Sequence, residues 1–420
     1  MRKTLRRIVR DQAGATAVIV GLTMPVVAGM GMLGVDAAMW YSERRDLQTA
    51  ADAAALAGAL HKAYGYGVSS VATIATRDAQ RNGFTPGNGT ITVTNPPASG
   101  PGTGDPGAVE VVLRENLPMF YARVLGRDAA TVTVRATAAT TLDDEFCILG
   151  LDPTMDAAVD VQGNATVSMS CGIAVNSVSP KALSIAGSVS ITASSASISG
   201  NMHISGNPSV NFSEPPRSGQ PPVNDPYKDL AVPPFGACTA NNTTAQNAVT
   251  LSPGVYCGGL KVNAGATVDL DPGVYIMAGG SFSVAGGGTV RGDDVTIILT
   301  DDAGGNYTTV KINGGADIEL NAPSTGSWAG ILFYQDRNAP SHQGSQVINN
   351  TFTGGADMIM NGAVYFPSQG IEYTGNAAVA SQCLQLIGRR VIMTGTSQMA
   401  NNCASQGTET LGVARVRLLR

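Results

Sequence analysis

An uncharged run of 23 residues, Ala13 to Val35, is the feature that most restricts the fold of this 420-residue chain. As an α-helix it would extend about 35 Å, which is enough to cross a bilayer. Five basic residues precede it: Arg2, Lys3, Arg6, Arg7 and Arg10. Basic flanks stay on the cytoplasmic side, and Trp40 and Tyr41 stand where an interfacial aromatic belt would lie. The pattern predicts a cytoplasmic tail over residues 1–12 and a transmembrane helix over residues 13–35.

A cleaved signal peptide is the main alternative. Signal peptides have apolar cores of about 7–15 residues and a small-residue cleavage site. The run here is longer, and no clean site of that kind lies before Asp36. A type IV prepilin would need a Glu five residues after Gly14, where Ala-Thr-Ala-Val-Ile stands instead. An uncleaved anchor is therefore favoured, with processing left open.

Composition excludes several classes of protein. The chain has 26 Lys+Arg against 31 Asp+Glu, and only 14% of its residues are charged. Nucleic-acid-binding domains carry a basic excess, so no nucleic-acid partner is expected. The three histidines, His61, His203 and His342, are far apart, which argues against a histidine-built metal centre. We expect no cofactor, and the 51 glycines favour a β-rich, glycine-turned architecture.

A helix with a small-residue face is predicted directly after the apolar run. Leu47, Ala51, Ala54 and Gly58 fall at spacings that place them on one side of an α-helix. Small side chains would let a second helix approach closely on this face. The plainer interpretation is an alanine-rich helix of high intrinsic propensity.

The same region resembles the TadE/TadG-like family of tight-adherence (Tad/Flp) pilus-assembly proteins. The matching features are Gly14-Ala15 opening the apolar run, Pro25 within it, Val35-Asp36 closing it, and the string LQTAADAAALA over residues 47–57. The resemblance continues loosely to residue 140, through residues 117–121 and 130–139. It implies a single-pass protein of the bacterial inner membrane, with its bulk periplasmic or otherwise extracytoplasmic. It also implies Tad/Flp pilus-assembly components as partners and no catalytic activity.

One departure from the family matters. Several members carry a von Willebrand A domain with an Asp-x-Ser-x-Ser metal motif, whereas Asp-x-Ser occurs nowhere in this chain. An integrin-like metal-dependent adhesion site is therefore not expected. Residues 36–140 are predicted to form a TadE/TadG-like helical and α+β region, with a helix over 69–81 ending at Asn82-Gly83 and strands near 90–94, 108–113 and 131–137.

Internal repeats dominate residues 141–420. Pro-Gly-Val-Tyr at 253–256 recurs at 272–275, and Gly-Gly-Ala-Asp at 314–317 recurs at 354–357. The first string recurs after 19 residues and the second after 40, and fixed periods of 20–50 residues are typical of repeat architectures. We predict a mainly β fold, a right-handed parallel β-helix-like rod with coils of about 20 residues, interrupted by a proline-rich insert at residues 213–250. A β-sandwich is the second candidate.

The six cysteines all follow the apolar run, which fits an oxidising compartment. In chain order they form pairs about one coil apart, which would place the two members on neighbouring rungs. We therefore predict the bonds Cys147–Cys171, Cys238–Cys257 and Cys383–Cys403, one of 15 possible connectivities.

The sequence favours a non-enzymatic role: assembly, anchoring or surface display of a Tad/Flp pilus or secretion apparatus, in support of adhesion. Uncharged Ser/Thr/Asn-rich faces could also bind glycans. A β-helix lyase or hydrolase is the first alternative. Its acidic candidates are Asp293-Asp294, Asp301-Asp302 and Asp143-Asp144-Glu145. A free-standing adhesin is the second.

Overall fold

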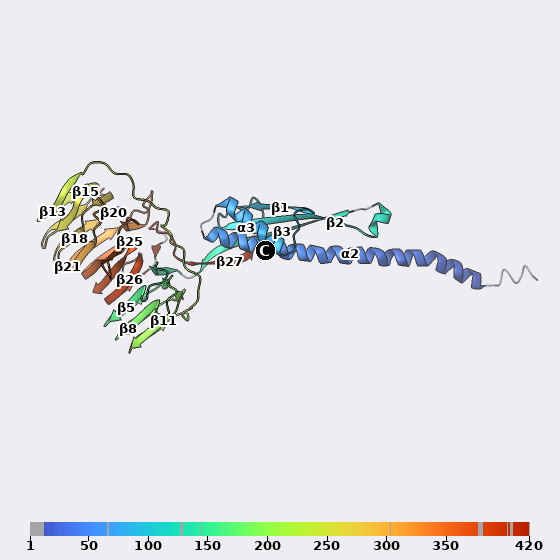
Figure 1. Cartoon of the computed structure of the whole chain (residues 1–420), viewed down its shortest axis with the longest axis horizontal. Coiled ribbons are helices and arrows are strands. Elements are labelled where there is room, and N and C mark those ends of the chain that lie inside the picture. Colours follow the sequence, from blue (N-terminus) through green and yellow to red (C-terminus); the bar gives the residue numbers. More distant parts are fainter. Residues whose placement is uncertain are drawn as a thin grey trace, which may run out of the picture. The chain divides into compact units, whose positions relative to one another are not determined.

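The computed structural model describes residues 12–64, 67–126, 129–143, 145–302, 304–376, 381–400, 402–403 and 406–419 (Figure 1). The chain divides into two compact units: residues up to 141 together with 414–420, and residues 142–413. The last strand, β27 (Val413–Leu419), belongs to the sheet of the first unit. The second unit is thus inserted in sequence between two strands of the first, whereas the repeat region was predicted to run on to residue 420.

The first unit contains two α-helices, a four-stranded sheet and a short 3-10 helix. Its elements are α2 (Gln12–Ala63), α3 (Val68–Arg81), β1 (Gly89–Thr94), β2 (Ala108–Pro118), η1 (Ala122–Leu125), β3 (Ala129–Asp143) and β27. The sheet order is β1-β2-β3-β27, and β1, β2 and β3 pair antiparallel. One continuous helix, α2, holds both the apolar run and the small-residue face.

The core of the first unit lies between the helices and the sheet. In α3, Val71, Ala75 and Ala79 recur every four residues and are fully buried. They pack in one cluster with the C-terminal half of α2 and with sheet residues such as Val111 and Val134. The sheet buries one apolar set against the helices, which is the arrangement expected for an α+β unit.

The second unit contains a sheet of 21 strands, in which every resolved pairing is parallel. A further pair, β23 (His342–Gln343) and β24 (Gln346–Val347), is antiparallel. The large sheet contains β4 (Phe146–Gly150), β5 (Val159–Gly163), β6 (Thr166–Met169), β7 (Gly172–Val175), β8 (Leu183–Gly187), β9 (Ser190–Ala193), β10 (Ala196–Ile198), β11 (Met202–Gly206), β12 (Ser209–Phe212), β13 (Ala240–Ala245), β14 (Val249–Leu251), β15 (Gly254–Val262), β16 (Thr267–Leu270), β17 (Gly273–Ala278), β18 (Phe282–Val284), β19 (Thr289–Gly292), β20 (Val295–Thr300), β21 (Val310–Asn321), β22 (Ile331–Gln335), β25 (Asn349–Asn376) and β26 (Leu384–Met399).

Successive strands visit three parallel ladders in turn. Ladder 1 contains β4–β7–β10, ladder 2 contains β5–β8–β11, and ladder 3 contains β6–β9–β12. The remaining strands continue the same ladders, for example β17–β20–β22 in ladder 1. A β-sandwich of antiparallel sheets would not give these pairings. The three ladders close around one apolar core.

The coils are not stacked in chain order. The last coil, β26, pairs with β4, β5 and β6 of the first coil: Leu386 lies beside Ile148, and Val391 beside Val159. The chain therefore enters the stack in its middle and runs out to one end at β12. It resumes at the other end with β13 and returns to β26, an order that Figure 1 also shows.

A strap, residues 213–239, carries the chain between the two ends. The predicted insert, residues 213–250, was too long, because residues 240–245 and 249–251 form β13 and β14. These two strands have few apolar residues and no proline, but they pair with β15 and β16 and so complete a coil. Only the proline-rich part is free of regular strands, as expected for a residue type without a backbone N–H.

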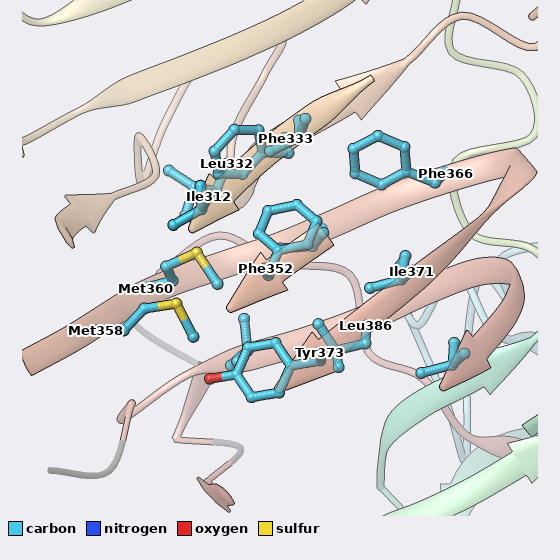
Figure 2. Packing of buried hydrophobic residues seen from close by; sticks show 14 of the residues in the cluster. Ile312, Leu332, Phe333, Phe352, Met358, Met360, Phe366, Ile371, Tyr373 and Leu386 are labelled. Atoms are coloured by element: carbon cyan, nitrogen blue, oxygen red, sulfur yellow. The ribbon is translucent and has the colours of Figure 1, made fainter. Parts of the chain in front are cut away.

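Aromatic side chains fill part of the core of the second unit (Figure 2). Phe333, Phe352 and Phe366 are fully buried, and their rings contact edge to face at centroid distances of 5.3 and 5.9 Å. Met358 and Met360 lie beside them in the same cluster (Figure 2). Edge-to-face contact is a preferred ring geometry. Each such pair stabilises the fold by about 0.5–1.5 kcal/mol beyond the contribution of the buried apolar area.

Candidate membrane-anchor and assembly site

The N-terminal half of α2 exposes large apolar side chains on all sides. Val18, Leu22 and Met30 are 61%, 70% and 69% exposed, and no residue of the most apolar window is buried. The Thr23 hydroxyl donates a hydrogen bond to the carbonyl oxygen of Ile19 at 2.8 Å, so this hydroxyl has its partner within the helix. A helix that is apolar all round and unpacked is suited to lipid. Within the described part of the chain it is the one helix long and apolar enough to cross a membrane.

The predicted orientation residues Arg2, Lys3, Arg6, Arg7 and Arg10 lie outside the described residues. The two predicted belt residues differ from each other. Tyr41 is 68% exposed, whereas Trp40 is partly buried against the core of the first unit. Arg44 lies over the Trp40 ring, 5.6 Å from its centroid. Trp40 therefore belongs to the folded domain as well as to the end of the apolar segment.

Asp36 is the first charged residue after the apolar run, and it is 3% exposed. Its carboxylate accepts hydrogen bonds from the backbone N–H groups of Phe120, Tyr121 and Ala122, at 3.2, 2.9 and 2.6 Å. Charge-assisted bonds of this kind are stronger than neutral ones. Asp36 therefore fixes the connection between β2 and η1 against α2 at the point where the apolar segment ends.

Sequence reasoning missed this role of Asp36, which it noted only as the end of the apolar run. A small cavity of about 230 Å³ lies next to it, lined by Asp36, Met39, Trp40, Glu43, Leu117, Pro118, Met119 and Phe120. Phe120 and Tyr121 are 60% and 40% exposed. The sequence signal for this contact was the apolar Leu-Pro-Met-Phe-Tyr string at residues 117–121, because a connection between two elements is usually polar.

The structure buries the whole predicted helix-packing face. Leu47 is 6% exposed, Ala51 and Ala54 are fully buried, and Gly58 is buried as well. A Cβ on Gly58 would lie 3.0 Å from a methyl carbon of Val109 in β2 and 3.5 Å from Cβ of Ala75 in α3. The face thus contacts both a helix and the sheet, and glycine allows the closest approach.

The six cysteines are paired in the second unit as the one-coil spacing predicts. Cys147 is bonded to Cys171, Cys238 to Cys257, and Cys383 to Cys403, with Cα separations of 5.7, 5.6 and 4.8 Å. The second of these bonds joins the end of the strap to β15. Disulfides persist in oxidising compartments, so this set is compatible with an extracytoplasmic location.

A polar network holds the middle of the strap against the outer side of ladder 1. Asp225 accepts hydrogen bonds from Nη2 of Arg337 at 3.0 Å and from the hydroxyl of Tyr365 at 2.9 Å. The Tyr334 hydroxyl donates to the carbonyl oxygen of Leu230 at 2.6 Å, and the rings of Tyr227 and Tyr365 meet edge to face. Burial raises the pKa of Tyr334 to about 12 and that of Tyr365 further, so both hydroxyls remain donors at neutral pH.

Two of the acidic candidates of the enzyme alternative flank β20, with Asp293-Asp294 before it and Asp301-Asp302 after it. Asp302 accepts hydrogen bonds from the side-chain amide of Asn306 and from the N–H of Gly304, and these bonds lower the pKa of its exposed carboxyl. Asp293 accepts a bond from the Asn321 amide instead. Among the described residues no three His, Cys, Asp or Glu side chains are arranged to hold a metal ion. Asp302 thus contacts Asn306 within one turn, and Asp293 contacts β21.

These features define a class of protein. Its folded α+β unit is continuous with an apolar helix of membrane length, and a disulfide-bonded repeat unit is inserted into the sequence of that α+β unit. Residues 14–61 match the family model described as Flp pilus-assembly TadE/G-like. The matched segment covers the apolar half of α2, Asp36 and the buried small-residue face. The similarity to TadE/G-like proteins therefore lies in this N-terminal segment. No curated protein and no solved structure matches the chain.

Proposed function

We propose that this protein is a single-pass component of the bacterial inner membrane that assists assembly, anchoring or surface display of a Tad/Flp pilus. The observation that carries the proposal is the TadE/G-like match over residues 14–61, on a helix whose first half is exposed and apolar and whose second half is packed in a folded unit. The basic residues before the helix support a cytoplasmic N-terminus. Both folded units then lie in the periplasm or beyond.

The second unit serves in this proposal as a structural element rather than an enzyme. Its three parallel ladders, coiled about one core, support a right-handed parallel β-helix, the hand that parallel β crossovers almost always take. Rigid coil faces of low charge suit display, adhesion and contact with pilus components or glycans. The three disulfides would stabilise such a rod in an oxidising periplasm.

Carbonate extraction and protease accessibility of the full-length protein in its native envelope test this proposal. We expect a carbonate-resistant, full-length species that is digested only after the outer membrane is opened. Val20→Arg combined with Val26→Arg should release it from the membrane fraction, because each arginine costs about 2.5–3.5 kcal/mol at the helix centre. Val68→Arg, at an exposed position of α3, is the control and should remain in the membrane fraction.

Other outcomes separate the alternatives. A shortened, carbonate-soluble species would mean that residues 1–35 are a cleaved signal, which contradicts the anchor. Full-length protein that is digested in intact cells would favour the free-standing adhesin. Pilus association is tested on its own by deleting the gene and counting surface pili, with an unchanged number contradicting the assembly role.

A further inference from the structure

The two ends of the repeat unit expose apolar positions that are buried in every neighbouring coil. At one end, Ile204 of β11 continues the column of Ile185, which is fully buried, yet Ile204 is 46% exposed. At the other end, Val249 of β14 continues the column of the fully buried Val268 and is 37% exposed. Residues paired in register in parallel strands point to the same side of the sheet. The apolar core therefore extends to both ends of the stack.

The same end strands have one unpaired edge each. Among the described residues, β11 and β12 pair only with β8 and β9, and β13 and β14 pair only with β15 and β16. Ladder 1 is different at the β11–β12 end, because the strap covers it: Arg217 and Ala196 join by a backbone hydrogen bond of 2.8 Å. Ladders 2 and 3 are thus the open ones.

Neither end coil carries a charged residue. Residues 202–212 and 240–251 contain no Asp, Glu, Lys or Arg. Soluble β proteins commonly place charges, above all lysine, on free edges in order to prevent edge-to-edge association. The outer surface of an intermediate strand such as β21 does carry charges, for example Lys311, Asp317 and Glu319. The uncharged ends are therefore suited to pairing.

The fold already contains one coil-on-coil junction between segments that are not consecutive. The ladders pass from β26 to β4, β5 and β6 although the intervening chain lies elsewhere in the stack. One coil can thus stack on another with matching ladders when the two coils do not follow each other in the sequence. The β11–β12 end and the β13–β14 end have matching ladders, because both belong to the same continuous stack with the same strand direction.

We propose that the partner of these ends is a second copy of this chain, docked head to tail. Residues 243–245 of β13, which belong to ladder 2, would lie beside β11 of the preceding copy, and β14 would lie beside its β12. Ile204 and Val249 would then be covered as the corresponding residues are inside the stack. Because the two surfaces differ, the contact does not close on itself and extends into a filament. This inference goes beyond the proposed function and does not require a pilus partner.

Sedimentation velocity of the full-length protein in detergent, over a range of concentrations, tests the proposal. We expect the wild-type protein to form species whose mass grows with concentration. Ile204→Lys and Val249→Lys should each remove every species larger than one chain. A one-to-one mixture of the two variants should give a two-chain species and nothing larger, because one intact end remains on each. Val178→Lys, at a 65% exposed position after β7 and outside both end coils, is the matched control.

Three results would overturn the proposal: a wild-type protein that stays single at all concentrations, end variants that assemble like the wild type, or a mixture that stays single. Association through α2 would persist in all variants and is thereby distinguished. Thermal midpoints close to that of the wild type show that a variant is folded. Should a lysine variant fail this control, Ile204→Thr and Val249→Thr provide β-branched replacements, which should weaken assembly at least tenfold.

Discussion

Arg390 donates a hydrogen bond from Nη2 to Oδ2 of Asp160 at 2.9 Å, across 230 residues of sequence. Its neighbour Arg389 forms an ion pair of 2.9 Å with Asp152. Both pairs join the last coil of the repeat unit to the first. The acids are almost fully buried, with 5% of the Asp152 side chain and 10% of the Asp160 side chain exposed, so each needs its arginine.

The junction between these coils should depend on the ion pairs. Arg390→Met leaves Asp160 buried without a cation and removes the bond from Nε to the carbonyl oxygen of Ala157. We expect a loss of about 1–3 kcal/mol in the free energy of unfolding, read from thermal or denaturant midpoints. Arg291→Met is the control: its pairs with Asp317 and Glu319 are exposed and should contribute less than about 1 kcal/mol. Equal losses in both variants would contradict the role assigned to the junction.

The Cys238–Cys257 bond should hold the end of the strap. Replacing both cysteines by serine opens a loop of 19 residues, and we expect a loss of about 3 kcal/mol. Lys228 is exposed in the strap, so limited trypsin digestion at this residue should become faster. Wild-type protein treated with a reductant should respond in the same direction. Cleavage at Lys228 at an unchanged rate would show that the Asp225 network alone fixes the strap.

Asp36→Asn should weaken the attachment of the β2–η1 connection to α2. The amide keeps the shape of the side chain but loses the negative charge and one acceptor, while three backbone N–H groups need a partner. We expect a loss of about 1–3 kcal/mol. Hydrogen exchange at the amides of residues 120–122 measures the effect locally. Asp46→Asn, whose side chain is 62% exposed, should leave that exchange unchanged.

The buried Tyr373 should make the protein sensitive to alkaline pH. Burial raises the pKa of its hydroxyl well above the ordinary value of 10.0. Above pH 10 the unfolded chain loses this proton while the folded chain keeps it, so stability is complete below pH 10 and falls as pH rises. The slope from one such group is about 1.4 kcal/mol per pH unit. Tyr373→Phe should reduce the slope of stability between pH 10 and 11.5, and an unchanged slope would refute the assignment.

Local patterns in the sequence predicted the parts of this protein that depend on near neighbours. The uncharged run gave the apolar half of α2, and the spacing of Leu47, Ala51, Ala54 and Gly58 gave its buried face. Cysteines one coil apart are paired in the structure. Each of these features rests on a fixed spacing of a few residues or one coil, which a periodic pattern records directly.

Only the tertiary structure decided which coil lies on which. Every coil has a similar apolar pattern, so the pattern predicts a coil but not which coil stacks on it. Nothing in the sequence near β26 indicates that it pairs with β4. The ion pair of Arg390 with Asp160, the strap along ladder 1 and the return of β27 to the first unit all follow from that order. Asp36 belongs with them, because its three N–H donors lie more than 80 residues away. Such contacts form because the complete fold buries charged side chains and pairs strand edges that are far apart in the chain. A short segment of sequence does not contain both partners.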